Sequence, residues 1–216
     1  MAKIGVIGAT GNAGSALVKE ASKRGHEVTA VVRNSTKARQ LLGEDIPIVE
    51  RDAFDLSPED LASFDVVVDA FATAPAQAYQ HVDLAALLVR FFRESPTPRL
   101  FFILGAGSLQ TGDDGHLAVE DLQALPDSAS WISIPQNQLK ELKFLRDVDE
   151  VQWVGISPGL TFQAGEAKPL IQGKDTLLFN ENGESVTSSG TLARAIVDEI
   201  ENPRHANERF TVIDGV

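Results

Sequence analysis

Cysteine is absent from this chain of 216 residues, which excludes disulfides, thiol catalysis and zinc sites built on thiolates. No apolar run approaches membrane-spanning length, and the start of the chain has no signal-peptide pattern. Positive charge is also scarce: the net charge of -12 argues against nucleic acids or anionic membranes as partners. We therefore expect a soluble, cytoplasmic protein that acts on a small molecule, as a monomer or homodimer.

A convincing set of metal ligands is also lacking. Asp113, Asp114 and His116 gather in a glycine-flanked segment, but no second ligand set accompanies them. We expect a polar loop over residues 110–115 and no metal site.

The most informative stretch is K-I-G-V-I-G-A-T-G-N-A-G, from Lys3 to Gly14. An apolar strand pattern meets glycine, and a helical pattern follows. Gly8 lets the chain turn sharply, Gly11 lets the backbone approach a pyrophosphate, and Gly14 permits close packing of helix on strand. The spacing predicts a dinucleotide whose pyrophosphate binds at the helix N-terminus.

The second expected strand ends at Arg33, where dinucleotide sites distinguish their two cofactors. An acidic residue there binds the ribose 2′-hydroxyl of NAD, whereas an arginine accommodates the 2′-phosphate of NADP. Arg33 offers a planar fork to a phosphate, and Lys37 adds a point charge. The sequence favours NADP(H) over NAD(H); an arginine that merely ends a strand in solvent is the alternative.

Strand and helix patterns alternate along the chain, which predicts a single α/β domain over residues 1–216. The expected architecture is a doubly wound, mostly parallel Rossmann sheet with helices on both faces. Glycines and polar residues over about residues 158–190 indicate a small C-terminal lobe that closes over a substrate. Strands are expected at residues 4–7, 27–32, 46–49, 65–70, 100–104, 151–156 and 209–213, and helices at 15–23, 36–42, 58–64, 75–93, 134–145 and 192–201.

The long helix over residues 75–93 carries an apolar stripe at helical spacing. We expect this stripe to pack against the sheet, with a dimer seam as the alternative. Its members are Ala78, Val82, Ala85, Ala86, Val89 and Phe92.

The chain resembles the short-chain dehydrogenase/reductase superfamily, and within it the atypical branch of NAD(P)H-flavin reductases and NmrA-like proteins. The resemblance covers nearly the full length and rests on I-G-V-I-G-A-T-G-N-A-G-S, G-H-E-V-T-A-V-V-R-N, D-A-F-D-L and I-S-P-G-L-T-F. It implies residues for the pyrophosphate, the 2′-phosphate and the adenine, in that order: Gly8, Ala9, Thr10, Gly11, Asn12 and Ala13; Arg33 and Asn34; Asp52 and Ala53. It also implies a group that lines the nicotinamide and its ribose: Phe71, Ala72, Thr73, Gly105, Ala106, Pro158, Gly159 and Leu160.

One departure from the family pattern limits the chemistry. Typical members use a serine, a tyrosine and a lysine four residues after the tyrosine, which supplies a proton. Ser108 and Lys140 stand at plausible places for catalytic residues, but Gln136 occupies the tyrosine position. Because the single tyrosine, Tyr79, lies elsewhere, reduction of a ketone or aldehyde is disfavoured. Hydride transfer to a flavin or quinone needs mainly positioning, so we expect an NAD(P)H-dependent reductase with FMN, FAD or a quinone as acceptor.

Several alternatives remain at this point. Lys140 would orient the nicotinamide ribose and Ser108 would hydrogen-bond the cofactor or acceptor, but an exposed helix lysine and a turn-forming serine fit the sequence equally. The missing tyrosine also fits a non-catalytic NADP(H)-binding redox sensor of NmrA type. An epimerase or dehydratase of nucleotide sugars fits less well, because such enzymes generally depend on that tyrosine and have longer C-terminal lobes.

Overall fold

The computed structural model describes residues 1–216 and contains a central sheet of eight strands, in the order β10-β12-β8-β5-β4-β1-β2-β3. Every pairing is parallel except that of β10 with β12. Because β1 pairs with both β2 and β4, the sheet extends in two directions from β1. Its strands are β1 (Lys3–Ile7), β2 (Glu27–Val32), β3 (Ile48–Glu50), β4 (Val66–Asp69), β5 (Arg99–Ile103), β8 (Trp153–Ser157), β10 (Leu170–Gly173) and β12 (Glu208–Asp214).

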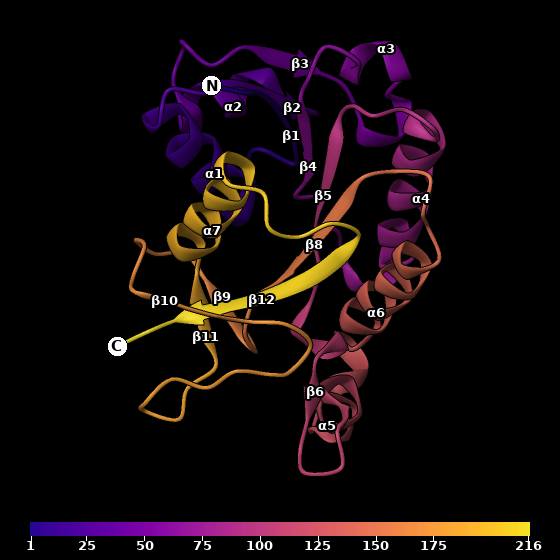
Figure 1. Ribbon diagram of the computed structural model, residues 1–216, viewed down its shortest axis with the longest axis vertical. Coiled ribbons are helices and arrows are strands. Elements are labelled where there is room, and N and C mark those ends of the chain that lie inside the picture. Colours follow the sequence, from indigo (N-terminus) through magenta and orange to yellow (C-terminus); the bar gives the residue numbers. More distant parts are fainter.

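Helices cover both faces of the sheet, with α1 and α7 packed together on one face and α4 and α6 on the other (Figure 1). This confirms the doubly wound, mostly parallel α/β architecture. None of the helices is both long enough and apolar enough to cross a bilayer. The helices are α1 (Asn12–Lys23), α2 (Ser35–Leu42), α3 (Pro58–Leu61), α4 (Gln80–Phe92), α5 (Ala118–Ala124), α6 (Ser133–Arg146) and α7 (Ser189–Glu201), with short 3₁₀ turns η1 (Ala53–Asp55), η2 (Pro75–Gln77), η3 (Ala106–Ser108) and η4 (Ser128–Ser130).

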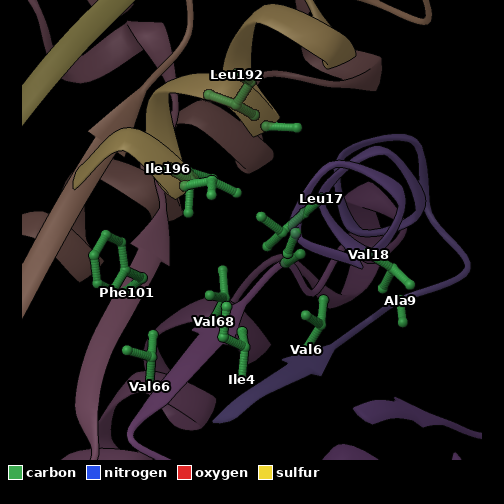
Figure 2. Close-up of a cluster of buried hydrophobic side chains, with 14 of the residues drawn as sticks. Ile4, Val6, Ala9, Leu17, Val18, Val66, Val68, Phe101, Leu192 and Ile196 are labelled. Carbon is green, nitrogen blue, oxygen red and sulfur yellow. The ribbon is translucent and has the colours of Figure 1, made fainter. Parts of the chain in front are cut away.

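Alternate residues of β1 enter two different cores, because a strand turns successive side chains to opposite faces. Ile4 and Val6 belong to the core under α1 and α7, whereas Ile7 belongs to the core under α4 and α6. Figure 2 shows the first core, where Leu17 of α1 and Ile196 of α7 approach the side chains of the sheet. Burial on both faces accounts for the continuous apolar runs in these strands.

The helix α4 differs from its prediction in both start and buried face. It begins at Gln80, and Pro75–Gln77 form the separate turn η2. The predicted stripe is wrong at Val82 and Ala86, which are only half-buried. Apolar residues occupy about two thirds of this segment, so more than one apolar stripe fits helical spacing and periodicity alone does not select a face. The residues that the helix buries are His81, Leu84, Ala85, Leu88, Val89 and Phe92.

The expected loop over residues 110–115 is a small hairpin of β6 (Gln110–Thr111) and β7 (His116–Leu117). The helix α5 follows it directly and was not predicted. This helix has only seven residues, and its N-terminal cap comes from Glu120, whose Oε1 accepts from Leu117 N at 3.2 Å. Such a short helix carries too little periodicity to be recognised from sequence.

The segment 158–190 is more closely joined to the sheet than its composition indicates. The strand β9 (Thr161–Gln163) pairs with β11 (Val186–Ser188), but β10 between them extends the central sheet. Leu177 packs against η3 and α5 in a small apolar cluster. The lobe is therefore anchored to the domain on two sides, and it does not form a separate lid.

We expect Leu17→Ala to lower the free energy of unfolding by about 2–5 kcal/mol, because it opens a cavity between α1 and the sheet. The Leu17 side chain is fully buried, at 0% exposure. Leu41→Ala is the matched control, because this helical leucine is 40% exposed and should cost less than about 1 kcal/mol. Urea denaturation measures both, and equal losses would contradict the packing described for α1.

Candidate functional site

The turn between β1 and α1 has no room for a side chain at two of its glycines. Gly8 has a φ of 77°, and a Cβ there would lie 2.5 Å from the carbonyl oxygen of Ala70. A Cβ on Gly14 would collide with the backbone of Gly8 and Ala9. At Gly11 a Cβ would meet only the Gly8 carbonyl oxygen, at 3.4 Å. Packing thus requires the first and third glycines, and the second leaves space for a ligand.

The N-terminus of α1 faces this space. Gly11 is the N-cap and has no side chain to satisfy the N–H groups of the first turn. Such unpaired groups, together with the helix dipole, favour an anion. Two cavities meet here, and Gly11 borders both of them.

The first cavity has a volume of about 200 Å³ and lies at the carboxyl ends of β1, β2 and β3. Backbone of the glycine turn forms one side, and charged side chains form the other. It is lined by Ile7, Gly8, Thr10, Gly11, Val31, Val32, Arg33, Lys37, Arg51, Asp52, Ala53, Ala70, Phe71 and Ala72.

Three cationic side chains border the first cavity: Arg33, Lys37 and Arg51. Arg33 and Lys37 form no ion pair, and Arg51 Nη1 lies 3.4 Å from Asp60 Oδ2. Sequence analysis did not single out Arg51. The pairing of β2 with β3 provides the signal, because these parallel strands end in register just before Arg33 and Arg51.

Two predicted polar contacts are already used within the protein. Asn34 caps α2, and its Oδ1 accepts from Lys37 N at 2.8 Å. Asp52 caps η1 in the same way, accepting from Phe54 N at 3.0 Å. Asp52 still borders the first cavity, whereas Asn34 borders neither cavity.

The second cavity is larger, about 550 Å³, and its lining is mostly apolar. The carboxyl ends of β4, β5 and β8 form its floor, which is where open α/β sheets bind ligands. Its volume is in the range of small-molecule sites. It is lined by Gly11, Asn12, Ala13, Ala70, Phe71, Ala72, Thr73, His81, Ile103, Leu104, Gly105, Ala106, Gly107, Leu122, Trp131, Ile134, Pro135, Gln138, Pro158, Gly159, Leu160 and Phe162.

The outer wall of the second cavity comes from a different part of the chain than expected. Leu122 of α5, Trp131 and the first turns of α6 supply most of it. The segment 158–190 contributes only residues 158–160 and Phe162. Closure of this segment over a substrate stays a prediction.

Lys140 lies away from the second cavity. The side of α6 that borders the cavity carries Ile134, Pro135 and Gln138. Two residues beyond Gln138 is about 200° around a helix, so Lys140 emerges on the opposite side. It is exposed, and its Nζ lies 3.3 Å from Asn137 Oδ1. This geometry does not support the prediction that Lys140 orients the nicotinamide ribose.

Ser108 is buried behind the cavity and borders neither of the two. Its Oγ donates to the Gly105 carbonyl oxygen at 2.9 Å and accepts from Arg209 Nη1 at 3.0 Å. Arg209 also donates to Ser157 Oγ and pairs with Asp175. Ser108 thus belongs to a buried network that joins η3 to β12, and the partner Arg209 was not predicted from the sequence.

The structure places no tyrosine at either cavity, since Tyr79 is 54% exposed. Among the residues that line the second cavity, His81 alone has a titratable side chain. Neither His81 nor Gln138 was predicted from the sequence as a site residue. A histidine within an apolar helix pattern was the available signal for the first.

Three titratable groups are buried together beside the second cavity. His81 Nδ1 lies 3.9 Å from Glu141 Oε2, and Asp69 Oδ1 accepts from Phe71 N at 2.9 Å. Burial raises the pKa of Asp69 to about 7. Burial and the nearby Asp69 carboxylate raise the pKa of Glu141 well above its usual value, and burial lowers the pKa of His81.

The predicted cofactor residues converge on the two cavities. All of them except Ala9, which is fully buried, and Asn34 border one cavity or the other. Their contact with a bound dinucleotide stays a prediction. The glycine turn, the helix N-terminus and the two joined cavities fit the parts of such a molecule: anion, adenosine end and nicotinamide end.

These features define a dinucleotide-binding α/β protein of Rossmann type. The family model for NAD(P)H-binding proteins matches residues 8–203, and the chain belongs to that family. The match confirms the resemblance to the atypical short-chain dehydrogenase/reductases.

Relatives cover the chain over nearly its full length. It is 40% identical over 213 residues to YwnB of Bacillus subtilis, an uncharacterized protein, with 98% of each chain covered. A Lactobacillus casei structure superposes with a TM-score of 0.93 at 41% identity, covering 99% of this chain and 100% of the other. A Streptococcus pneumoniae structure, named a candidate NADH-flavin reductase, gives a TM-score of 0.88 at 31% identity over 99% and 100% of the two chains.

Asp69→Asn should change how stability depends on pH. In the unfolded chain this carboxyl has an ordinary pKa near 4, whereas the folded value is about 7. The folded state therefore binds the proton more tightly, and stability falls as pH rises from about 4 to about 7. We expect the variant to be as stable as the wild type at pH 4 and more stable by about 2–4 kcal/mol at pH 8.

Urea denaturation at the two pH values measures this difference. Asp149→Asn is the control, because this exposed aspartate has no ion-pair partner and its replacement should leave the pH dependence unchanged. A constant difference between Asp69→Asn and wild type from pH 4 to 8 would contradict the raised pKa.

Proposed function

We propose that the protein is an NADPH-dependent reductase that transfers a hydride to a flavin or a quinone-like acceptor. The observation that carries this proposal is the second cavity, which is apolar and holds His81 as its single titratable side chain. A planar, uncharged ring system matches such a lining. A nucleotide sugar would bring a diphosphate that no cationic residue there could pair with.

The first cavity supports the preference for NADPH over NADH. Arg33, Lys37 and Arg51 surround it, and the first two lack a carboxylate partner. A 2′-phosphate would neutralise these charges, and an arginine fork can bind it through two hydrogen bonds. Asp52 and Ala53 would lie beside the adenine, and Gly8 to Ala13 would hold the pyrophosphate.

The dinucleotide supplies a hydride when it is bound, and the protein positions the acceptor against it. Residues 71–73 and the Gly105–Ala106 backbone would support the nicotinamide, and the aromatic wall at Trp131 and Phe162 would hold the acceptor. No tyrosine is available to protonate an alkoxide, which disfavours ketones and aldehydes. The name of the Streptococcus pneumoniae relative agrees with a flavin acceptor.

The second candidate function is a non-catalytic NADP(H)-binding redox sensor. It is favoured by the positions of Ser108 and Lys140, because neither residue of the usual catalytic set reaches the second cavity. Such a protein would use the same cofactor residues and respond to the oxidation state of the bound dinucleotide. Turnover separates the two candidates.

Arg33→Asp should weaken NADPH binding much more than NADH binding, because the variant places a carboxylate where the 2′-phosphate would bind. We expect the ratio of the NADPH and NADH dissociation constants to change by roughly 30-fold or more. Arg39→Asp, on the exposed side of α2, is the matched control and should leave the ratio unchanged. Isothermal titration with each dinucleotide measures the ratio, and an unaltered ratio in Arg33→Asp would overturn the cofactor preference.

Steady NADPH oxidation is expected when FMN or a quinone is added to the purified protein. Gly11→Val should abolish binding of both dinucleotides and with it this activity, since a branched side chain would occupy the space at the α1 N-terminus. Absorbance at the reduced-nicotinamide band follows the reaction. Tight NADPH binding without turnover across a panel of flavins and quinones would reject the reductase and favour the sensor.

A further inference from the structure

Three buried titratable side chains come from three different elements and meet beside the second cavity. Asp69 ends β4, His81 lies in the first turn of α4, and Glu141 lies in the second half of α6. They are 6%, 5% and 2% exposed, respectively. These residues are far apart in the sequence, and the fold brings them together.

The imidazole of His81 is the member of this group that borders the cavity. Its ring stands edge-to-face against Phe71, with the centroids 5.6 Å apart, and Phe71 borders both cavities. Its Nδ1 faces Glu141 Oε2 at 3.9 Å. One ring nitrogen is thus directed at a buried carboxyl, while the ring itself is part of the cavity lining.

Glu141 is poorly satisfied for a buried group. Its Oε2 is buried and has no hydrogen-bond partner. Buried polar atoms are nearly always paired, and a carboxyl without a partner is costly. Folding alone would favour an apolar residue at this position of α6, as at its neighbours Leu142 and Leu145.

We propose that His81 and Glu141 form a proton relay that opens into the second cavity and supplies the proton taken up by the reduced acceptor. This inference rests on the proposed reductase function. It gives the delocalised anion of the reduced acceptor a proton donor other than water. His81 is the catalytic residue of the relay, and Glu141 acts through it.

A flavin or quinone that has accepted a hydride gains two electrons and carries a negative charge until it takes up one proton. The Nε2–H bond of His81 breaks and this proton moves to the anionic nitrogen or oxygen of the acceptor. His81 Nδ1 takes the carboxyl proton of Glu141, so the imidazole stays neutral. After the product leaves, His81 Nε2 takes a proton from solvent in the cavity and Nδ1 returns its proton to the Glu141 carboxylate, which restores the starting state.

The electrostatics of the group suit this order of transfer. Burial and Asp69 raise the pKa of Glu141, which favours its protonated carboxyl, and burial lowers the pKa of His81, which favours the neutral imidazole. Glu141 from α6 faces the imidazole, and Asp69 from β4 acts on Glu141, whereas Asp83 and Lys140 on α4 and α6 are exposed. The 3.9 Å separation exceeds a hydrogen bond by about 1 Å, and such contacts commonly shorten when a site is occupied.

The first test is kinetic. His81→Ala and Glu141→Gln should lower the rate of quinone reduction by NADPH roughly 100-fold, while leaving the NADPH dissociation constant within about twofold. Added imidazole should restore activity to His81→Ala and leave Glu141→Gln unaffected. His116→Ala, at a partly buried histidine that borders neither cavity, is the matched control and should behave as the wild type.

Where His81→Ala does not bind NADPH, His81→Gln takes its place, because an amide of similar length preserves the packing. A solvent deuterium isotope effect is then compared between wild type and Glu141→Gln. The relay predicts an effect in the wild type that changes in the variant, whereas a purely structural role for Glu141 would leave it unaltered.

The second test needs no cofactor. Nuclear magnetic resonance of the imidazole in the free protein should find His81 neutral at pH 7, with His81→Gln used to assign the signal. An imidazolium at pH 7 would overturn the relay, because Glu141 would then be the ionised partner. In the kinetic test, wild-type turnover with unimpaired His81 and Glu141 variants would overturn the relay alone. Absence of any wild-type turnover would overturn the proposed reductase and the relay with it.

Discussion

The structure depends on a backbone-to-backbone contact at the end of β1. The chain leaves the strand at Gly8 close beneath the Ala70 carbonyl at the end of β4, and α1 returns over the same turn at Gly14. Because neither glycine carries a Cβ, the helix N-terminus lies directly on the carboxyl edge of the sheet. Both cavities share this edge, so the same contact positions α1 against the two halves of the site.

The two halves differ in charge, and this difference follows from the strands that border them. The first cavity lies beyond β2 and β3, whose ends deliver Arg33 and Arg51. The second lies beyond β4, β5 and β8, and small or apolar residues such as Ala70 and Leu104 follow these strands. The first cavity therefore suits a charged ligand end and the second an uncharged one, and Gly11 borders both.

The parts of this arrangement that sequence predicts are those encoded locally. The strand β2 begins and ends as its β-branched pattern indicates, at Glu27 and Val32, and the glycine spacing indicates the turn before α1. Sequence also predicted the start of α7 to within a few residues, because the helix begins next to Ser188, which caps it by accepting from Thr191 N. Each of these signals involves residues only a few positions apart, where short-range hydrogen bonding and periodicity determine conformation.

The parts that sequence did not predict depend on contacts between residues far apart in the chain. His81 and Glu141 are brought together by the packing of α4 on α6, and the pairing of Ser108 with Arg209 needs β8 and β12 to lie side by side. Lys140 shows the converse: its spacing in the chain matched a family pattern, but the rotation of α6 directs it into solvent. The spacing of residues in the sequence thus predicted the glycine turn before α1 better than it predicted the side chains near the second cavity.

The position of β12 also affects how the chain folds during synthesis. The strand β10 has β12 as its sole neighbour in the central sheet, and β12 in turn lies between β10 and β8. Until residues 208–214 have left the ribosome, β8 is an unpaired edge and β10 has no strand to join. Parallel pairing from β3 through β8 can proceed as the nascent chain emerges, but closure of this edge waits for β12. The interval between the two is when the exposed edge of β8 is open to intermolecular pairing.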